Sequence, residues 1–298
     1  MQTELESLAC ANPRPRINTQ KLLLPAALVS TLILWAAAFS AIPIALESFS
    51  PGQVAAGRQV LSASLTLPIL VLFWRGRIWP ALKRDFFNIL LMGLSGITFY
   101  HLALSSGQRT IGAGAASLLV NLTPIITAIF AAWLLREKLT WRVVAGGALG
   151  FVGAAALILS GNSDFSIDWN ALLIVAATIS QAFYFVQQRK LTARYDVLSL
   201  AVITIWIGAI TLLPFGGGFE LAFTEASERS LWALVFLGAG SGLIPYIGWT
   251  YVISKLPAGR ATVWLYIIPP ISILIGWQLL GEQPTISLLF SGAIILTG

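Results

Sequence analysis

Hydrophobic residues form long runs along most of this 298-residue chain, and short stretches between the runs carry most of the charges. A helix needs about 20 apolar residues to cross the hydrocarbon core of a bilayer. The pattern therefore predicts an all-α integral membrane protein with ten transmembrane helices, or eight or nine if weak neighbouring runs merge. The last run is short, which leaves open whether the natural chain continues beyond Gly298. The expected spans are 22–46, 54–74, 86–106, 115–135, 143–159, 171–187, 198–215, 231–253, 261–280 and 286–298.

The overall composition agrees with a chain that lies in lipid. Hydrophobic residues make up 57% of it and charged residues 10%, with a mean hydropathy of +0.84. Soluble domains average about 25% charged residues. The charges are therefore too few to cover a water-facing surface of this size, and much of the surface is expected to face the bilayer.

Lysines and arginines mark one side of the expected bundle. Fifteen of the 18 lie in the N-terminal region or in the second, fourth, sixth and eighth connections, whereas the odd connections contain only Arg109 and Arg229. Short loops rich in these residues stay in the cytoplasm. We therefore expect a multi-pass protein of a bacterial inner membrane with both termini cytoplasmic and with residues 1–21 as a cytoplasmic tail. The net charge of +6 follows this alternation, so it does not indicate a nucleic-acid partner.

The two halves of the chain are similar to one another at a shift of 145 residues, which aligns Pro124 with Pro269. Each half contains five expected spans, over 22–160 and 161–298, so the second copy enters the membrane upside down. Inverted repeats are a common architecture of secondary transporters, which bind substrate near the midplane between the halves. The alternative is that the duplication only builds a stable bundle.

A motif that occurs once in each half carries a family resemblance. The first copy consists of Pro124, Leu135, Glu137, Thr140 and Gly147, and the second of Pro269, Leu280, Glu282, Thr285 and Gly292. With this motif, nearly the whole chain resembles the drug/metabolite transporter superfamily in its ten-helix EamA-type form. Within the superfamily it is similar to bacterial exporters of amino acids and metabolites, including the aromatic amino acid exporters. The repeated glutamates are expected to cap helices or to pair with loop arginines.

The resemblance implies a secondary transporter that exports or exchanges a small organic metabolite by alternating access around a central cavity. Amino acids, aromatic or otherwise neutral, are the expected substrates. A sugar-phosphate or nucleotide-sugar exchanger is the main alternative, but phosphates need several basic side chains and Arg58 is the only one within a span. A membrane-embedded enzyme is disfavoured because the chain has one histidine and no carboxylate central to a span. A channel would lack a closed central site.

Polar and aromatic residues gather on particular faces of the expected helices. Polar groups in a membrane usually face the bundle interior, and residues three or four apart share a helix face. His101 lies in such a stripe, and Tyr246 is its counterpart in the second half. If these faces converge, they enclose a central cavity with aromatic walls. The candidate substrate-binding residues are Trp35, Arg58, Tyr100, His101, Asn121, Thr123, Gln181, Tyr184, Tyr246 and Tyr266.

Several of these candidates are also implied by the resemblance. The family often has a tryptophan at the position of Trp35. Tyr100 and His101 match positions where the aromatic exporters line their cavity. Asn121 and Thr123 match two more, but that branch usually has bulkier aromatic residues there, which leaves the identity of the substrate open.

Two candidates have alternative explanations. A single histidine is more often a packing residue, although His101 is the only candidate that titrates near neutrality. Arg58 either extends to the outer interface or attracts a substrate carboxylate within the membrane. Because no aspartate or glutamate is central to a span, we expect facilitated diffusion or exchange unless His101 carries a proton.

No cofactor or metal is expected. The one cysteine, Cys10, cannot form an intramolecular disulfide, and one histidine does not build a histidine-rich metal site. The expected partners are a small-molecule substrate and the lipid bilayer, with monomer and homodimer both open.

Overall fold

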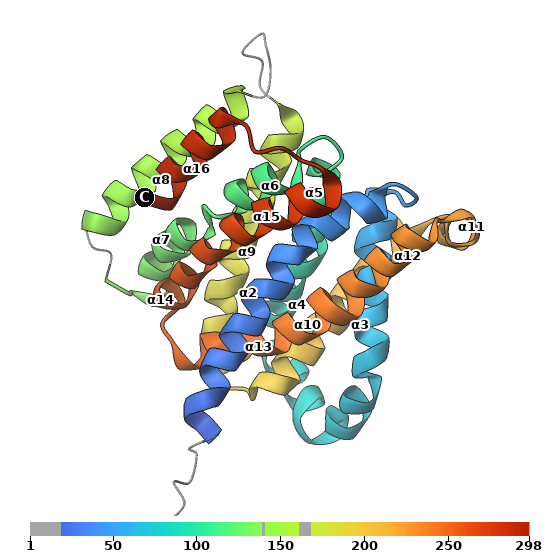
Figure 1. Ribbon diagram of the computed structural model, residues 1–298. Coiled ribbons are helices and arrows are strands. Elements are labelled where there is room, and N and C mark those ends of the chain that lie inside the picture. Colours follow the sequence, from blue (N-terminus) through green and yellow to red (C-terminus); the bar gives the residue numbers. More distant parts are fainter. Residues whose placement is uncertain (1–18, 139–140, 161–167, 298) are drawn as a thin grey trace, which may run out of the picture.

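The computed structural model describes residues 19–138, 141–160 and 168–297, and every regular element in these ranges is helical (Figure 1). The all-α fold class is therefore confirmed. The first 18 positions of the expected tail lie outside the described residues. The elements are α2 (Thr19–Leu46), α3 (Pro51–Phe73), η1 (Trp74–Ile78), α4 (Trp79–Gly93), η2 (Leu94–Phe99), α5 (Tyr100–Gly107), α6 (Ala113–Val120), α7 (Thr123–Leu135), α8 (Trp141–Ser160), α9 (Trp169–Thr192), α10 (Val197–Leu212), η3 (Leu213–Gly216), α11 (Phe219–Glu225), α12 (Glu228–Val235), η4 (Phe236–Leu243), α13 (Ile244–Lys255), α14 (Ala258–Thr262), η5 (Val263–Ile267), α15 (Ile268–Leu280) and α16 (Ile286–Thr297).

Seven helical stretches in the described ranges are long and apolar enough to cross a membrane. Six of them each match one expected span. The seventh, Pro51–Gly107, covers two expected spans. The remaining two expected spans are shorter helices, because the apolar part of α8 is Val144–Ala156 and α16 has 12 residues.

The stretch Pro51–Gly107 is too long for a single span. Its 57 residues would extend about 85 Å as one straight helix, whereas the hydrocarbon core is about 30 Å thick. The five π-helical residues of η1 interrupt it, and Arg75 and Arg77 within them are exposed. Figure 1 shows the chain turning back between α3 and α4, so this stretch folds as two helical segments that run in opposite directions.

Polar residues in the connections determine where several helices begin. Ser50 and Gln53 form a capping box at the start of α3, with hydrogen bonds of 3.3 and 2.9 Å. The side chains of Asp168 and Asp196 accept backbone N–H groups at the starts of α9 and α10. A cap of this kind typically stabilises a helix by about 1 kcal/mol.

Helices α7 and α15, which carry the two copies of the proline motif, end in the same backbone conformation. Arg136 after α7 has φ 56°, and Gly281 after α15 has φ 70°. Glycine adopts this left-handed conformation freely, whereas other residues are strained in it by about 1–2 kcal/mol. Both helix ends therefore have the left-handed conformation, but only Gly281 adopts it without strain.

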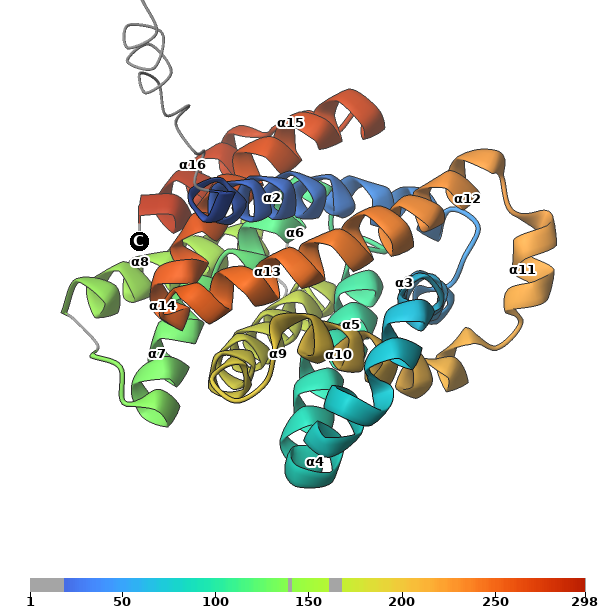
Figure 2. The ribbon, with the colours of Figure 1, turned by 90° about the horizontal axis from the view of Figure 1, so that it is seen from below.

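Helices from the two halves of the chain pack against each other in matched pairs. Helix α2 packs on α13 as α5 packs on α9, and α15 packs on α2 as α7 packs on α9. Helices α3 and α10 pack directly, as do α8 and α16 (Figures 1 and 2). One large cluster of buried apolar residues runs through these contacts. The two halves are thus interleaved around a common centre.

Candidate functional site

A narrow cavity lies at the centre of the bundle, with a free volume of about 40 Å³. A single water needs about 10–15 Å³ of such volume, so the cavity as it stands holds a few waters and no metabolite. Binding of a larger molecule requires the surrounding helices to separate. The lining residues are Trp35, Ala38, Phe39, Ile42, Arg58, Tyr100, His101, Leu104, Ser117, Val120, Asn121, Thr123, Gln181, Phe185, Tyr246, Leu265 and Ile268.

Two broken helices border this cavity. Pro124 lacks the N–H that would bond the carbonyl of Val120, and the helix stops between α6 and α7. The hydroxyl of Thr123 donates to that carbonyl instead. Pro269 has the same effect opposite Leu265, where the 3₁₀ turn η5 precedes α15. Irregular backbone at membrane depth is tolerated where it is buried in protein or lines a cavity, so the proline motif helps to create the site.

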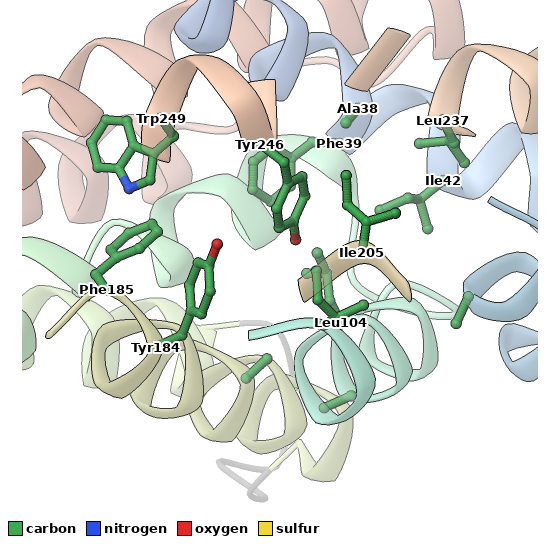
Figure 3. Packing of buried hydrophobic residues seen from close by; sticks show 14 of the residues in the cluster. Ala38, Phe39, Ile42, Leu104, Tyr184, Phe185, Ile205, Leu237, Tyr246 and Trp249 are labelled. Carbon is green, nitrogen blue, oxygen red and sulfur yellow. The ribbon is translucent and has the colours of Figure 1, made fainter. Parts of the chain in front are cut away.

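Aromatic rings form one wall of the cavity. The ring of Trp35 lies 6.1 Å from that of Tyr246 and 6.3 Å from that of Phe185, between ring centroids. Behind them Trp249 packs 5.4 Å from Trp35 and 5.0 Å from Phe185. Figure 3 shows Phe185, Trp249 and Tyr246 together, with the hydroxyls of Tyr184 and Tyr246 directed into the same space. These spacings are typical of favourable aromatic pairs.

A hydrogen bond of 3.0 Å joins His101 Nε2 to the hydroxyl of Tyr246, and the two residues are 145 positions apart. The hydroxyl of Tyr246 donates to the carbonyl of Gly96 at 3.3 Å. Because a hydroxyl has one hydrogen, Nε2 of His101 then carries the proton of their shared bond. Nδ1 of His101 is left as an acceptor, and it has no partner among the described residues.

The guanidinium of Arg58 is buried inside the bundle. Its side chain is 2% exposed, and Nη2 donates to the hydroxyl of Ser241 at 3.1 Å. Nε has no hydrogen-bond partner in the described ranges, and none of the ion pairs found there includes Arg58. The side chain therefore does not extend to the outer interface. A buried, unpaired charge of this kind is costly, which favours a role in binding an anion.

Two amide side chains also present unpaired polar atoms. Oδ1 of Asn121 and Oε1 of Gln181 are buried without a hydrogen-bond partner in the residues that the structure describes. The other end of the Asn121 amide is occupied, because Nδ2 donates to the carbonyl of Ser117 at 3.3 Å. Buried polar atoms are nearly always paired in native proteins, so these two unpaired oxygens are available as acceptors for a ligand.

The structure brings eight of the ten candidate residues together around this one cavity. They are Trp35, Arg58, Tyr100, His101, Asn121, Thr123, Gln181 and Tyr246. Tyr184 is not among the lining residues, and its hydroxyl accepts from Gln188 at 2.7 Å. Tyr266 lies in η5, partly exposed and away from the lining. That the eight contact a substrate stays a prediction.

Sequence reasoning missed several apolar lining residues and the partner of Arg58. Phe185 lies one helical turn after Gln181, so helix periodicity could have found it. Ile42 and Leu104 are ordinary members of apolar helices and gave no signal. Ser241 was missed because it lies in a π-helical turn, where α-helical spacing does not apply.

The repeated glutamate has a helix-capping role in one half of the chain. Oε1 of Glu282 accepts the N–H of Ala113 at 2.9 Å, and Oε2 accepts that of Gly114 at 3.4 Å. A carboxylate is favourable at the N-terminus of α6 because of the helix dipole. The capping role expected from the sequence is confirmed for Glu282.

Comparisons with known proteins match nearly the full length of the chain. The model of the EamA-like transporter family matches residues 23–159 and again residues 168–298. The uncharacterized transporter YdfC of Bacillus subtilis is 34% identical over 266 residues, which cover 89% of this chain and 86% of that protein. A probable terminal-alkyne amino-acid exporter of Streptantibioticus cattleyicolor is 31% identical over 276 residues, which cover 91% of this chain and 90% of that protein.

A solved crystal structure shares the fold. It matches with a TM-score of 0.60 at 19% identity, over 90% of this chain and 94% of the other. At this identity the likeness concerns the fold alone. Substrate identity must therefore be argued from the cavity.

Proposed function

The chain belongs to the EamA-like transporter family, and on this premise we propose that it exports or exchanges amino acids by alternating access around the central cavity. The family and its relatives indicate a multi-pass membrane transporter rather than an enzyme. The single observation that carries the proposal is the cavity at the bundle centre, where His101 meets its repeat counterpart Tyr246. A central site between two repeats is the arrangement that alternating access requires.

The proposal includes ten spans arranged as two inverted five-helix repeats, over 22–160 and 161–298. Three observations support it. The family model matches the chain twice, the helix pairs correspond between the halves, and repeat counterparts contact each other. A further contact between the halves joins Gln59 Nε2 to the carbonyl of Ile205, one residue beyond the counterpart of Gln59, at 3.3 Å. Equivalent positions of two copies meet only near the axis that relates them, so the contact of His101 with Tyr246 on the cavity lining supports a two-fold axis there.

The orientation follows from the basic residues. The even connections carry most of the lysines and arginines, which favours cytoplasmic termini in a bacterial inner membrane. Because each repeat has an odd number of spans, five, the two repeats are antiparallel in the membrane. With one half inverted, the same helix movement opens the cavity toward either side.

Amino acids are the proposed substrates because the cavity combines aromatic walls with few polar groups. One relative is named a probable amino-acid exporter, which supports the same class. A phosphate-bearing substrate fits less well, since Arg58 is the only arginine or lysine among the lining residues of the described chain. Doubly charged phosphates usually require several such groups.

Transport by purified protein in liposomes tests the proposal, with labelled phenylalanine, methionine, threonine and a sugar phosphate. We expect saturable uptake and counterflow of at least one amino acid, because a carrier exchanges substrate across one site whereas a channel does not. Alanine replacements at Trp35, Tyr100, His101, Asn121 and Tyr246 should each reduce uptake. Uptake of the sugar phosphate alone, or no effect of any replacement, would contradict the proposal.

A further inference from the structure

The unpaired polar atoms around the cavity fall into two groups of opposite hydrogen-bonding character. Arg58 supplies donors, because its Nε is unpaired in the described ranges and its Nη2 contacts the hydroxyl of Ser241. Asn121 and Gln181 supply acceptors, the atoms Oδ1 and Oε1, which are also unpaired there, and Nδ1 of His101 on α5 is a third unpaired acceptor. All three side chains are almost fully buried, with 2%, 2% and 4% exposed for Arg58, Asn121 and Gln181. Water outside the protein therefore does not satisfy these atoms.

Arg58 and the two amide acceptors belong to different helix pairs. Arg58 lies on α3, which packs on η4, the element that carries Ser241. Asn121 ends α6 and Gln181 lies on α9, and these two helices pack on each other. Figure 2 shows α3 apart from α6 and α9. The cavity thus has a cationic donor pole and a neutral acceptor pole, and aromatic side chains line much of the remainder.

We propose that this polarity selects a zwitterion and fixes its orientation: the substrate carboxylate binds Arg58, and its ammonium binds the amide oxygens of Asn121 and Gln181. The apolar side chain of the amino acid then faces the aromatic wall. This inference rests on the proposed amino acid transport and names the residues that set the specificity of that site.

The chemistry of each pole supports the assignment. A guanidinium binds a carboxylate through two parallel hydrogen bonds, and the pairing removes the cost of an isolated buried charge. An ammonium has three donors and no acceptor, which matches amide oxygens that lack donors. No carboxylate is among the lining residues that the structure describes, so a cation without its own carboxylate gains no counter-charge. Amines should therefore bind more weakly than amino acids.

Three compounds with one side chain separate the two poles: phenylalanine, phenethylamine without the carboxylate, and 3-phenylpropionate without the ammonium. Equilibrium binding to purified protein is measured for each. We expect the wild type to bind phenylalanine at least about tenfold more tightly than either analogue, a difference typical of one charged contact. Arg58→Gln should bind phenylalanine no more tightly than phenethylamine, but still more tightly than 3-phenylpropionate. Gln181→Met, which preserves the size of the side chain, should bind phenylalanine no more tightly than 3-phenylpropionate, but still more tightly than phenethylamine.

Thermal unfolding of Arg58→Met distinguishes binding from a structural role. Ser241 keeps its hydrogen bond to the carbonyl of Leu237, so removal of Arg58 leaves it paired. Because an uncompensated buried charge is removed, we expect a melting temperature equal to or above that of the wild type. A clear fall in melting temperature would show that Arg58 supports the fold and would overturn its assignment.

The outcomes separate this inference from the function on which it rests. If amino acids bind but Arg58→Gln leaves the preference over phenethylamine unchanged, the orientation is wrong and amino acid transport stands. If only 3-phenylpropionate binds and Arg58→Gln abolishes that binding, then an amino acid is not the substrate and the zwitterion proposal is wrong. The contact of Arg58 with a carboxylate would still be supported. If Gln181→Met leaves both preferences intact, the acceptor pole is wrong.

Discussion

Tyr246 connects the two halves of the protein through one hydroxyl group, which contacts His101 Nε2 and the carbonyl of Gly96. Tyr246→Phe leaves the buried Nε2 of His101 without its partner and removes one contact of the Gly96 carbonyl. We expect a loss of about 1–3 kcal/mol in the free energy of unfolding, the usual cost of an unsatisfied buried polar group. Denaturant unfolding in detergent measures it. Tyr251→Phe, on the same helix but partly exposed, is the control and should change stability little. Equal effects of the two variants would contradict the proposed role of the contact.

Asp85 is a buried carboxylate in the turn between the expected second and third spans, with 8% of its side chain exposed. The hydroxyl of Tyr195 donates to it at 2.6 Å, and Asn88 and Arg194 also contact it. These contacts, the Tyr195 hydrogen bond foremost, hold the pKa of Asp85 below its usual value, while burial acts in the opposite direction. The ionised carboxylate therefore links the turn to the end of α9.

A lowered pKa in the folded state makes stability depend on pH in one direction. The contribution of Asp85 is complete above the pKa of the unfolded chain, about 3.9, and is lost as pH falls through the lower folded value. We expect Asp85→Asn to melt at a lower temperature than the wild type at pH 6, and the gap to narrow as the pH falls below about 4. Melting curves across this range measure it, with Glu225→Gln on exposed α11 as control. A gap that does not depend on pH would contradict the role of the ionised form.

The types of residue in the spans predicted which side chains line the cavity better than they predicted the hydrogen bonds between them. Rare polar residues such as His101 and Asn121 stand out in apolar spans because burying them needs a reason, and both line the cavity. Their hydrogen bonds depend on helices that are distant in the chain, and no sequence spacing specifies those. Tyr184 and Tyr266 were selected by helix face and by repeat position. On α9 the structure places Phe185 rather than Tyr184 on the lining with Gln181, and Tyr266 lies in the 3₁₀ turn η5, away from the lining.

At the scale of helices and turns, the ends of α7 and α15 provide a matched comparison. Arg136 adopts the left-handed conformation that Gly281 adopts at the corresponding end. Arg136→Gly should therefore stabilise the protein by about 0.5–1 kcal/mol, and Gly281→Ala should destabilise it by about 1 kcal/mol. Thermal melting of both variants checks the opposite signs. The same sign for both would contradict the conformation described for these turns.

The helix elements themselves were largely predictable, because apolar length determines which segments cross a membrane. Their internal breaks were less so. Pro124 and Pro269 indicated possible kinks, and the structure places a helix break at each. The π-helical turns η2 and η4 had no sequence signal. Packing explains part of η2, since a Cβ at Gly96 would overlap the ring of Tyr184 on α9. Such tertiary contacts decide backbone geometry that local pattern does not.

At the scale of the whole molecule, the two-repeat proposal makes a prediction about topology. If the halves are antiparallel, residues 110 and 195 lie on opposite sides of the membrane, with 110 outside and 195 in the cytoplasm. Phosphatase fused after residue 110 should be active and after residue 195 inactive, and a fluorescent protein should give the reverse. Both fusions reporting the same side would contradict the ten-span arrangement.

The most direct test of alternating access is the accessibility of the cavity from each side of the membrane. Cys10→Ser removes the one native cysteine, and Ala38→Cys then places a thiol on the cavity lining. Ala63→Cys is the control, since Ala63 is equally buried in α3 but does not line the cavity. A membrane-impermeant thiol reagent is applied to right-side-out and inverted vesicles, with and without amino acid. Alternating access predicts that the cavity thiol on α2 reacts from both sides of the membrane and that substrate slows both reactions. The control thiol on α3 should react from neither side. Reaction of the cavity thiol from one side only would contradict alternating access.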